Sequence, residues 1–133
     1  MGTLQLEVVT PDKTVVSAEV EMVVCPGVEG EFGVLPQHVS LLSALKIGDL
    51  RYRVNGKDEN VFISGGFADV NNNVLSVLAE SAELAGEIDT ARAQAAKERA
   101  EKRLAAHDES VDQTRAEAAL QRAVTRLQVA QLR

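Results

Sequence analysis

The chain has 133 residues, of which 45% are hydrophobic and 26% charged, and this composition is typical of a folded globular protein. Its length suits one ordinary domain or two very small ones. Its 14 basic and 20 acidic side chains give a net charge of −6. This balance argues against a nucleic-acid-binding protein, because such proteins need excess basic charge to attract phosphates.

Cysteine content and the apolar runs indicate where the protein works. Cys25 is the only cysteine, so the chain can form no internal disulfide, and a reducing compartment is expected. Residues 1–6 lack the basic start and the apolar run of a signal peptide. No apolar run approaches the roughly 18 residues of a membrane span. We therefore expect a soluble intracellular protein.

Short strand patterns separated by turns fill the chain up to about residue 86. Apolar and polar residues alternate over 4–8, and a second alternation over 19–24 makes Val20, Met22 and Val24 its apolar members. Further strand-like runs cover residues 50–54, 60–63 and 74–79. Turn signals lie at residues 10–12, 26–27, 55–56, 65–66 and 71–73, and the Asn-Gly pair at 55–56 is a strong hairpin signal. This pattern predicts a small antiparallel β-sandwich or barrel.

The composition changes abruptly after residue 86. All 9 glycines and all 3 prolines lie at or before Gly86, whereas residues 87–133 contain neither and include 12 alanines. Residues 1–86 carry 5 basic and 12 acidic side chains, against 9 and 8 in residues 87–133. So clean a break predicts two segregated parts, an α+β arrangement with a strand domain at 1–86 and a helical domain at 87–133.

The second part has the signals of two helices. Asp89 is a good N-cap for a first helix over about 90–105, and Ser110 with Gln113 fits a capping box that opens a second helix over about 111–132. The break at 106–110 between them is short, which predicts an antiparallel helical hairpin.

The apolar seams of this hairpin are thin. One helix offers Ala93, Ala96, Ala100 and Leu104, and the other offers Leu120, Val124 and Leu127. Alanine buries little apolar area, at roughly 25 cal/mol per Å². We therefore expect a hairpin that is marginal alone and able to detach from the rest of the molecule.

No constellation of catalytic residues is visible. Cys25 and His38 could nominally pair as nucleophile and base, but a buried thiol and a loop histidine are the more ordinary interpretation. His107 is the only other histidine, and no metal-ligand spacing is present. The glycine-rich segment at 27–33 lacks the Lys-Ser/Thr of a phosphate-binding loop and carries two carboxylates, so it indicates a turn.

The arginines of the two helices are more informative. Arg92, Arg99 and Arg103 are spaced by seven and four residues, and the same spacing recurs at Arg115, Arg122 and Arg126. Each set lies on one helix face, where like charges four residues apart destabilise the helix by a few tenths of a kcal/mol. These stripes suggest an external anion, either a polyphosphate or an acidic protein surface, and a merely exposed basic face is an equally open alternative.

The order of several motifs resembles one protein family. The motifs are VTPD at 9–12, GEFGVLPQH at 30–38, SGGF at 64–67 and IDTARA at 88–93, which opens the two-helix tail. In this order, over nearly the whole chain, they closely resemble the epsilon subunit of bacterial and chloroplast F-type ATP synthases.

The resemblance implies a non-catalytic rotor subunit of a membrane-bound complex. Its N-terminal β-sandwich is expected to dock on the gamma subunit and the c-ring, and its helical hairpin to fold down on the sandwich or extend into the alpha/beta catalytic head. The resemblance also implies that the extended hairpin inhibits ATP hydrolysis. The implied location is peripheral, at the cytoplasmic face of the bacterial inner membrane or the stromal face of the thylakoid, without membrane insertion.

Particular residues follow from the same resemblance. Glu31 and His38 become candidates for the interface with gamma and the c-ring, because residues 29–38 match the segment expected at that end of the sandwich. Arg103 and Arg115 become candidates for an inhibitory basic face. Gln37 stands where glycine is usual in the family.

Some family members bind ATP on the folded hairpin through an Ile/Leu-Asp-x-x-Arg-Ala motif. Ile88, Asp89, Arg92 and Ala93 match that motif, and Glu83, Arg99, Arg122 and Arg126 stand where ATP-binding members have their other contacts. The four arginines could neutralise the triphosphate, and the two carboxylates could accept hydrogen bonds from adenine or ribose. ATP is thus expected as a regulatory ligand, with no obligatory cofactor and no metal.

Two other functions compete with this interpretation. A free-standing nucleotide-sensing adaptor of the same fold is the alternative, and it differs from a rotor subunit in not binding gamma stoichiometrically. A small hydrolase is disfavoured, because the chain offers no combination of nucleophile, base and metal ligands.

Overall fold

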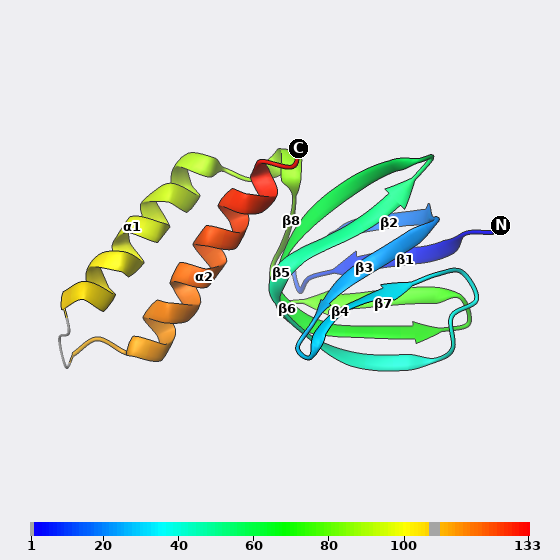
Figure 1. Cartoon of the computed structure of the whole chain (residues 1–133), viewed down its shortest axis with the longest axis horizontal. Coiled ribbons are helices and arrows are strands. Elements are labelled where there is room, and N and C mark those ends of the chain that lie inside the picture. The colour runs from blue at the N-terminus through cyan, green and yellow to red at the C-terminus, as the bar shows by residue number, and fades with distance from the viewer. Residues whose placement is uncertain (1, 107–109) are drawn as a thin grey trace.

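The structure is a computed structural model and describes residues 2–106 and 110–133. Its strands are β1 (Leu4–Val9), β2 (Thr14–Val20), β3 (Met22–Gly27), β4 (Gly30–Val34), β5 (Leu41–Val54), β6 (Lys57–Asn71), β7 (Val74–Ala79) and β8 (Ala82–Leu84). A short 3-10 helix η1 (Ala85–Glu87) leads to α1 (Thr90–Ala106) and α2 (Gln113–Ala130). The strands and the helices form separate bodies that meet at one end of the hairpin (Figure 1). The predicted division into a β-sandwich followed by a two-helix hairpin is confirmed.

The strands form one sheet that folds over itself into two layers. Its order is β2-β1-β7-β6-β5-β3-β4, and β8 pairs with β6 away from this path. The β1–β7 pair is parallel, and the other pairs in the described chain are antiparallel. The long strands β5 and β6 run through both layers, because β7 pairs with the second half of β6 and β8 with its first half.

The core between the layers is aliphatic, as the scarcity of aromatic residues requires. Leu4, Leu6 and Val8 on β1 are all buried, which confirms the alternation predicted for residues 4–8. Leu50 on β5 and Leu75 on β7 are fully buried as well. Burying a leucine side chain contributes roughly 1.5–3 kcal/mol, so this core is the main source of stability.

The alternation predicted across residues 19–24 is wrong beyond Val20. Glu21 separates β2 from β3, and after it Val23 and Cys25 face the core, while Met22 and Val24 are only partly buried. The reason is topological: β2 pairs with β1, whereas β3 pairs with β4 and β5. The chain changes its strand partners at Glu21, so the alternation of buried and exposed side chains starts anew after it.

Glycine at 65–66 is not the predicted turn. Both residues lie inside β6, with φ of 100° and 141°, where that strand passes from its β8 partner to its β7 partner. A Cβ on Gly66 would lie 1.9 Å from the carbonyl oxygen of Leu78, so no other residue fits. The predicted turn at 26–27 also lies inside a strand, since Gly27 pairs with Gly30 across the β3–β4 turn.

Two predicted turns are confirmed. Asn55 and Gly56, both at positive φ, join β5 to β6 as a two-residue hairpin, and Asn72 and Asn73 do the same between β6 and β7. Positive φ at both central residues is the type I′ geometry that suits the twist of paired strands, and asparagine and glycine tolerate it best.

The helices begin at aspartate caps. The Oδ1 atom of Asp89 accepts a hydrogen bond of 3.0 Å from the Arg92 amide, as predicted for the first helix. At α2 the N-cap is Asp112, whose Oδ1 atom accepts a hydrogen bond of 3.1 Å from the Arg115 amide. The capping box predicted at Ser110 is therefore wrong, and the helix starts later. An aspartate at the N-cap satisfies an orphan amide of the first turn. Residues 107–109 of the predicted break, including His107, lie outside the described residues.

Alanines form the seam between α1 and α2. Ala93 and Ala100 on α1 and Ala116 and Ala123 on α2 are buried. The larger apolar residues predicted for the seam (Leu104, Leu120, Val124 and Leu127) are only partly buried. Small side chains let the two helices approach closely, which leaves the larger side chains at the margins of the contact.

The hairpin meets the sandwich through a small apolar group. This junction cluster consists of Phe62 on β6, Ala85 on η1, Ile88 before α1, and Val129 and Ala130 at the end of α2. The other end of the hairpin points away from the strands (Figure 1). The structure therefore holds the hairpin on the sandwich by one end only.

Candidate functional site

A pocket opens where the two helices meet the last strand of the sandwich. This arginine pocket is lined by Glu83, Glu87, Asp89, Arg92, Ala93, Ala96, Arg99 and Arg126. It encloses about 410 Å³, within the roughly 300–1,000 Å³ of small-molecule sites. Its three arginines come from the two helices, and its three carboxylates come from β8, η1 and the residue before α1.

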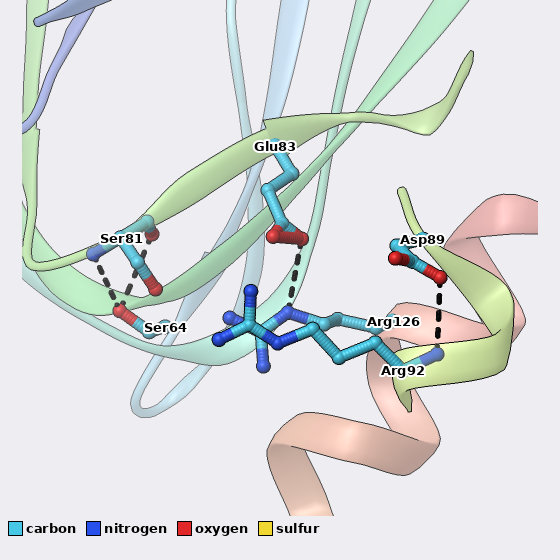
Figure 2. A network of polar contacts seen from close by, with 6 residues as sticks. All are labelled: Ser64, Ser81, Glu83, Asp89, Arg92 and Arg126. Atoms are coloured by element: carbon cyan, nitrogen blue, oxygen red, sulfur yellow. Dashed lines mark hydrogen bonds and ion pairs between the residues drawn. The ribbon is translucent and has the colours of Figure 1, made fainter. Parts of the chain in front are cut away.

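Local structure explains why these residues converge. Arg92 and Arg99 are two turns apart on α1, and the antiparallel return of α2 brings Arg126 beside them. The Ser64 hydroxyl accepts a 2.9 Å hydrogen bond from the Ser81 amide and donates to the Ser81 carbonyl, which fixes the start of β8 against β6 (Figure 2). Glu83 follows on β8 and is directed into the pocket.

Arg126 is the most constrained cation of the pocket. Its Nε donates to Oε2 of Glu83 over 2.9 Å (Figure 2), and its guanidinium carbon lies 4.4 Å from the centre of the Phe62 ring. The side chains of Arg126 and Glu83 are 25% and 36% exposed. Stacking a guanidinium on an aromatic face leaves its edge free for hydrogen bonds, so both contacts can form at once.

Arg92 and Arg99 carry charge that no other described residue pairs. In residues 2–106 and 110–133, the ion pairs are Arg126–Glu83 and Arg53–Asp58, neither of which involves them. The Asp89 carboxylate caps α1 through Oδ1, and the side chains of Arg92 and Arg126 extend towards the same part of the pocket (Figure 2). Two unpaired guanidinium groups beside carboxylate acceptors suit a ligand with an anionic end and a neutral polar end.

Six of the eight residues expected to contact ATP line this pocket, and two do not. Ile88 is buried in the junction cluster, where it packs with Phe62. Arg122 lines a second pocket, the tip pocket, with Arg103 and Arg115. The two arginine stripes therefore line two successive pockets along the hairpin.

Sequence reasoning missed two residues of the arginine pocket. Ala96 lies between Arg92 and Arg99 on the same face of α1, and the helical spacing alone would have found it. Glu87 lies on η1, which has no periodic signal, so only the folded chain reveals its position.

The two predicted interface residues lie apart on the sandwich. Residues 29–38, expected to form one loop, contain strand β4, with Glu31 near its start and His38 beyond its end. Glu31 is exposed and lines a pocket that also contains Asp49 and residues of α2. His38 lies in a turn in which its amide donates to the Leu35 carbonyl over 3.2 Å.

Sequence reasoning also missed an outer apolar patch on the sandwich. Leu42, Phe67 and Leu78 are 72%, 56% and 59% exposed, and Phe67 faces Leu78 directly across the β6–β7 pair. The sequence signal for this patch was leucine and phenylalanine at strand positions that face outward. Exposed apolar patches of this kind mark interaction surfaces.

The nominal nucleophile is inactive in this fold. Cys25 is fully buried, and burial raises the pKa of its thiol to about 12, so it stays protonated at neutral pH. The described residues contain no group of histidine, cysteine and acidic side chains placed to hold a metal ion. None of the helices in the described part of the chain has the length and apolar character needed to cross a membrane.

Comparisons with known proteins agree over nearly the whole chain. Residues 3–85 match the profile of the ATP synthase delta/epsilon chain beta-sandwich domain, and residues 87–131 match the long alpha-helix domain of the same chain. The ATP synthase epsilon chain of Nitratidesulfovibrio vulgaris (strain DP4) is 60% identical over 127 residues, covering 96% of this chain and 95% of the relative. That of Lawsonia intracellularis is 55% identical over 130 residues and 98% of each chain.

Solved structures extend the comparison to assemblies. A chain of the Euglena gracilis mitochondrial ATP synthase, in a structure of OSCP, F1 and the c-ring, superposes with a TM-score of 0.82 at 29% identity, covering 100% of this chain and 83% of that one. A chain of the Tetrahymena thermophila central stalk and c-ring shares the fold, with a TM-score of 0.61 at 13% identity over 95% of each chain. The chain belongs to the delta/epsilon family of ATP synthase, whose epsilon members are non-catalytic subunits of the complex.

Proposed function

We propose that this protein is a rotor subunit of the central stalk of an F-type ATP synthase, where it couples the catalytic head to the proton-driven c-ring. The match to epsilon chains over almost its full length carries this proposal. Its partners are the gamma subunit and the c-ring, and its place is peripheral, at the cytoplasmic face of the bacterial membrane.

The sandwich supplies the docking surface for gamma. The outer apolar patch of Leu42, Phe67 and Leu78 gives an area that water solvates poorly and a partner can cover. Glu31 and His38 supply polar contacts elsewhere on the same body. Co-purification tests the role: tagged protein should retain gamma in a 1:1 ratio, as expected for a rotor subunit. Phe67→Asp should lose gamma, while Lys57→Asp, a change of an exposed residue at the start of β6, should retain it.

Failure of the wild type to retain gamma would contradict the rotor role and favour a free-standing nucleotide sensor. Retention by both variants would leave the rotor role intact and move the docking surface elsewhere on the sandwich. The experiment therefore tests the rotor role and the position of the gamma-docking surface separately.

The hairpin acts as a regulatory arm. Its alanine seam and its single small contact with the sandwich support a two-state element that folds down or extends. When extended, it presents Arg103 and Arg115 of the tip pocket to acidic surfaces of the catalytic head and inhibits ATP hydrolysis.

ATP favours the folded-down hairpin by binding in the arginine pocket. Arg92 and Arg99 bind the phosphates together with Arg126, while Asp89 accepts a hydrogen bond from the nucleoside. A ligand that binds one state stabilises it in proportion to ln(1 + [ATP]/Kd). Arg122 joins this site only if its side chain turns from the tip pocket towards the phosphates.

Calorimetry on the isolated protein tests the ATP site. Arg92→Ala and Arg99→Ala should each weaken ATP binding by roughly 1.5–3 kcal/mol, the range for charge-assisted hydrogen bonds. Lys97→Ala is the matched control, because it removes one charge from α1 but lines a different pocket. Equal affinity in all four proteins, or no binding by the wild type at millimolar ATP, would exclude the site.

A further inference from the structure

Arg126 belongs to the arginine pocket and to the contact between the hairpin and the sandwich at the same time. It extends from α2, donates to Glu83 on β8 and stacks on Phe62 of β6. Among the described residues, its pair with Glu83 is the ion pair that joins a helix to a strand. The apolar contact at this end is the small junction cluster, which includes two alanines and has Ile47 of β5 packed against it.

The Arg126 guanidinium uses one edge to hydrogen-bond Glu83 and presents the other edge to the pocket. The Nε atom is engaged by Oε2 of Glu83 at 2.9 Å, and the contact is a single hydrogen bond rather than a two-point fork. Stacking on Phe62 fixes the plane of the group. Among the described residues no hydrogen bond engages its terminal nitrogens, which remain for a ligand in the pocket that Arg126 lines.

We infer that the Glu83–Arg126 pair is a latch that holds the hairpin on the sandwich when no nucleotide is bound. Glu83 serves as an internal anion for Arg126, and Phe62 is the platform that orients it. Glu83 is thus a positioning residue that acts through Arg126, in place of the adenine or ribose acceptor that the family resemblance implied. This inference rests on the mobile hairpin of the proposed function and adds its ligand-free regulation.

The surroundings of the Glu83–Arg126 pair let it stabilise the folded hairpin more than an ordinary surface ion pair would. Both side chains are partly shielded, whereas those of the Arg53–Asp58 pair are 43% and 41% exposed. Phe62 is fully buried beneath the guanidinium, so the cation lies over a surface without water. Because the apolar junction is small, a modest electrostatic contribution shifts the balance between folded and extended hairpin.

Distance measurement by electron spin resonance tests the latch without nucleotide. Spin labels at Asp12→Cys on the sandwich and Lys102→Cys on α1 report the hairpin position, and the buried Cys25 stays unlabelled. Glu83→Gln should raise the ratio of extended to folded hairpin roughly three- to tenfold. Phe62→Leu, which keeps an apolar side chain in the junction cluster but removes the aromatic platform, should raise it less.

Matched controls decide between the outcomes. Asp58→Asn breaks the other ion pair, which lies within the β5–β6 hairpin, and should leave the ratio unchanged. Val129→Ala weakens the junction cluster and should open the hairpin whether or not the latch exists. High salt should open the wild type but not the Glu83→Gln variant, since salt screens the charged pair.

If Val129→Ala opens the hairpin while Glu83→Gln does not, the latch is wrong and the mobile hairpin stands. If neither variant opens it, both the latch and the mobile hairpin are wrong. A wild type that fails to bind ATP would overturn the ATP site alone, because the latch is measured without nucleotide.

Discussion

The sandwich and the hairpin of this protein are stabilised in different ways. The sandwich buries leucine, isoleucine and valine side chains from seven of its strands in one shared core. The hairpin buries mainly alanines between its helices and meets the sandwich through the junction cluster and the Arg126–Glu83 pair. No hairpin residue belongs to the sandwich core as the described residues define it. The sandwich therefore has its own large core, whereas the hairpin has little apolar surface to hold it in place, as the proposed two-state arm requires.

Side-chain size gives this difference its energetic basis. Each buried CH₂ group is worth roughly 0.8 kcal/mol, so leucine contributes several times more than alanine to its own seam. In proteins, most of the stability of a helix comes from the packing of its apolar face against the rest of the molecule. The hairpin therefore depends on its contacts with the sandwich, and in the proposed function a ligand or a partner changes its position.

Removal of residues 87–133 is the strongest test of this division. The truncated chain should fold with the cooperative unfolding of the intact sandwich, because the sandwich core lies within residues 4–82. In the assembled enzyme, ATP hydrolysis should rise, since the proposed inhibitory arm is gone. Circular dichroism melting and ATPase assays measure the two effects. A truncated chain that cannot fold would show that the two bodies form one stability unit.

A pair of cavity-forming substitutions sharpens the comparison. Leu50→Ala in the sandwich core should lower the free energy of unfolding by roughly 2–5 kcal/mol for the whole protein. Val129→Ala in the junction cluster should cost about 2 kcal/mol and loosen only the hairpin. Hydrogen exchange followed by mass spectrometry distinguishes them. Faster exchange throughout the strands in the Val129 variant would contradict the local character of the hairpin contact.

The effect of Asp49 on the pH dependence of stability tests the contact between the sandwich and the hairpin. It lies on β5 opposite Phe62, with both carboxylate oxygens accepting from the Asn60 amide at 3.0 and 2.9 Å, in a pocket that α2 helps to line. Burial raises the pKa of Asp49, and the Asn60 hydrogen bonds and the nearby Arg51 oppose that rise. The folded protein therefore binds a proton at a pH where the unfolded chain does not.

The sign of the effect follows from this difference. As the pH falls through the raised pKa of Asp49, the stability of the wild type relative to Asp49→Asn should increase, and as the pH rises it should decrease. Urea unfolding of both proteins between neutral and mildly acidic pH measures it. The dependence should shrink in the truncated chain, where α2 no longer covers the site. An unchanged dependence there would assign the burial of Asp49 to the sandwich alone.

The sequence was sufficient to predict the fold class because each half follows a simple local rule. Alternation over 4–8 and the Asn-Gly turn at 55–56 need only neighbouring residues, and the structure confirms both. The phase beyond Glu21 and the conformation of residues 65–66 were mispredicted, because they depend on which strands the chain pairs with next. Pairing with strands that are distant in the sequence sets these features, and the local sequence pattern does not reveal it.

The candidate site divides in the same way. Helical spacing correctly grouped Arg92 with Arg99, because both lie on one face of one helix. It could not show that Arg126 faces Glu83 and stacks on Phe62, since these three residues lie on three different elements. The family resemblance supplied the names of contact residues, but the placement of Arg122 in the tip pocket needed the folded hairpin.

The smallest expected effect is confined to the sandwich and should leave the hairpin where it is. Gln37 has a φ of 63°, a left-handed conformation that costs a residue with a side chain roughly 1–2 kcal/mol, and its amide donates to Oδ1 of Asn73 over 2.8 Å. Gln37→Gly removes this strain and keeps the amide, but it also adds freedom to the unfolded chain. Stability should therefore rise by less than about 1 kcal/mol in urea unfolding. Asn72→Gly is the matched control, because Asn72 has a φ of 52° but asparagine tolerates that region, so its gain should be smaller. A loss of stability in the Gln37 variant would show that the glutamine side chain, rather than the backbone conformation alone, stabilises this turn.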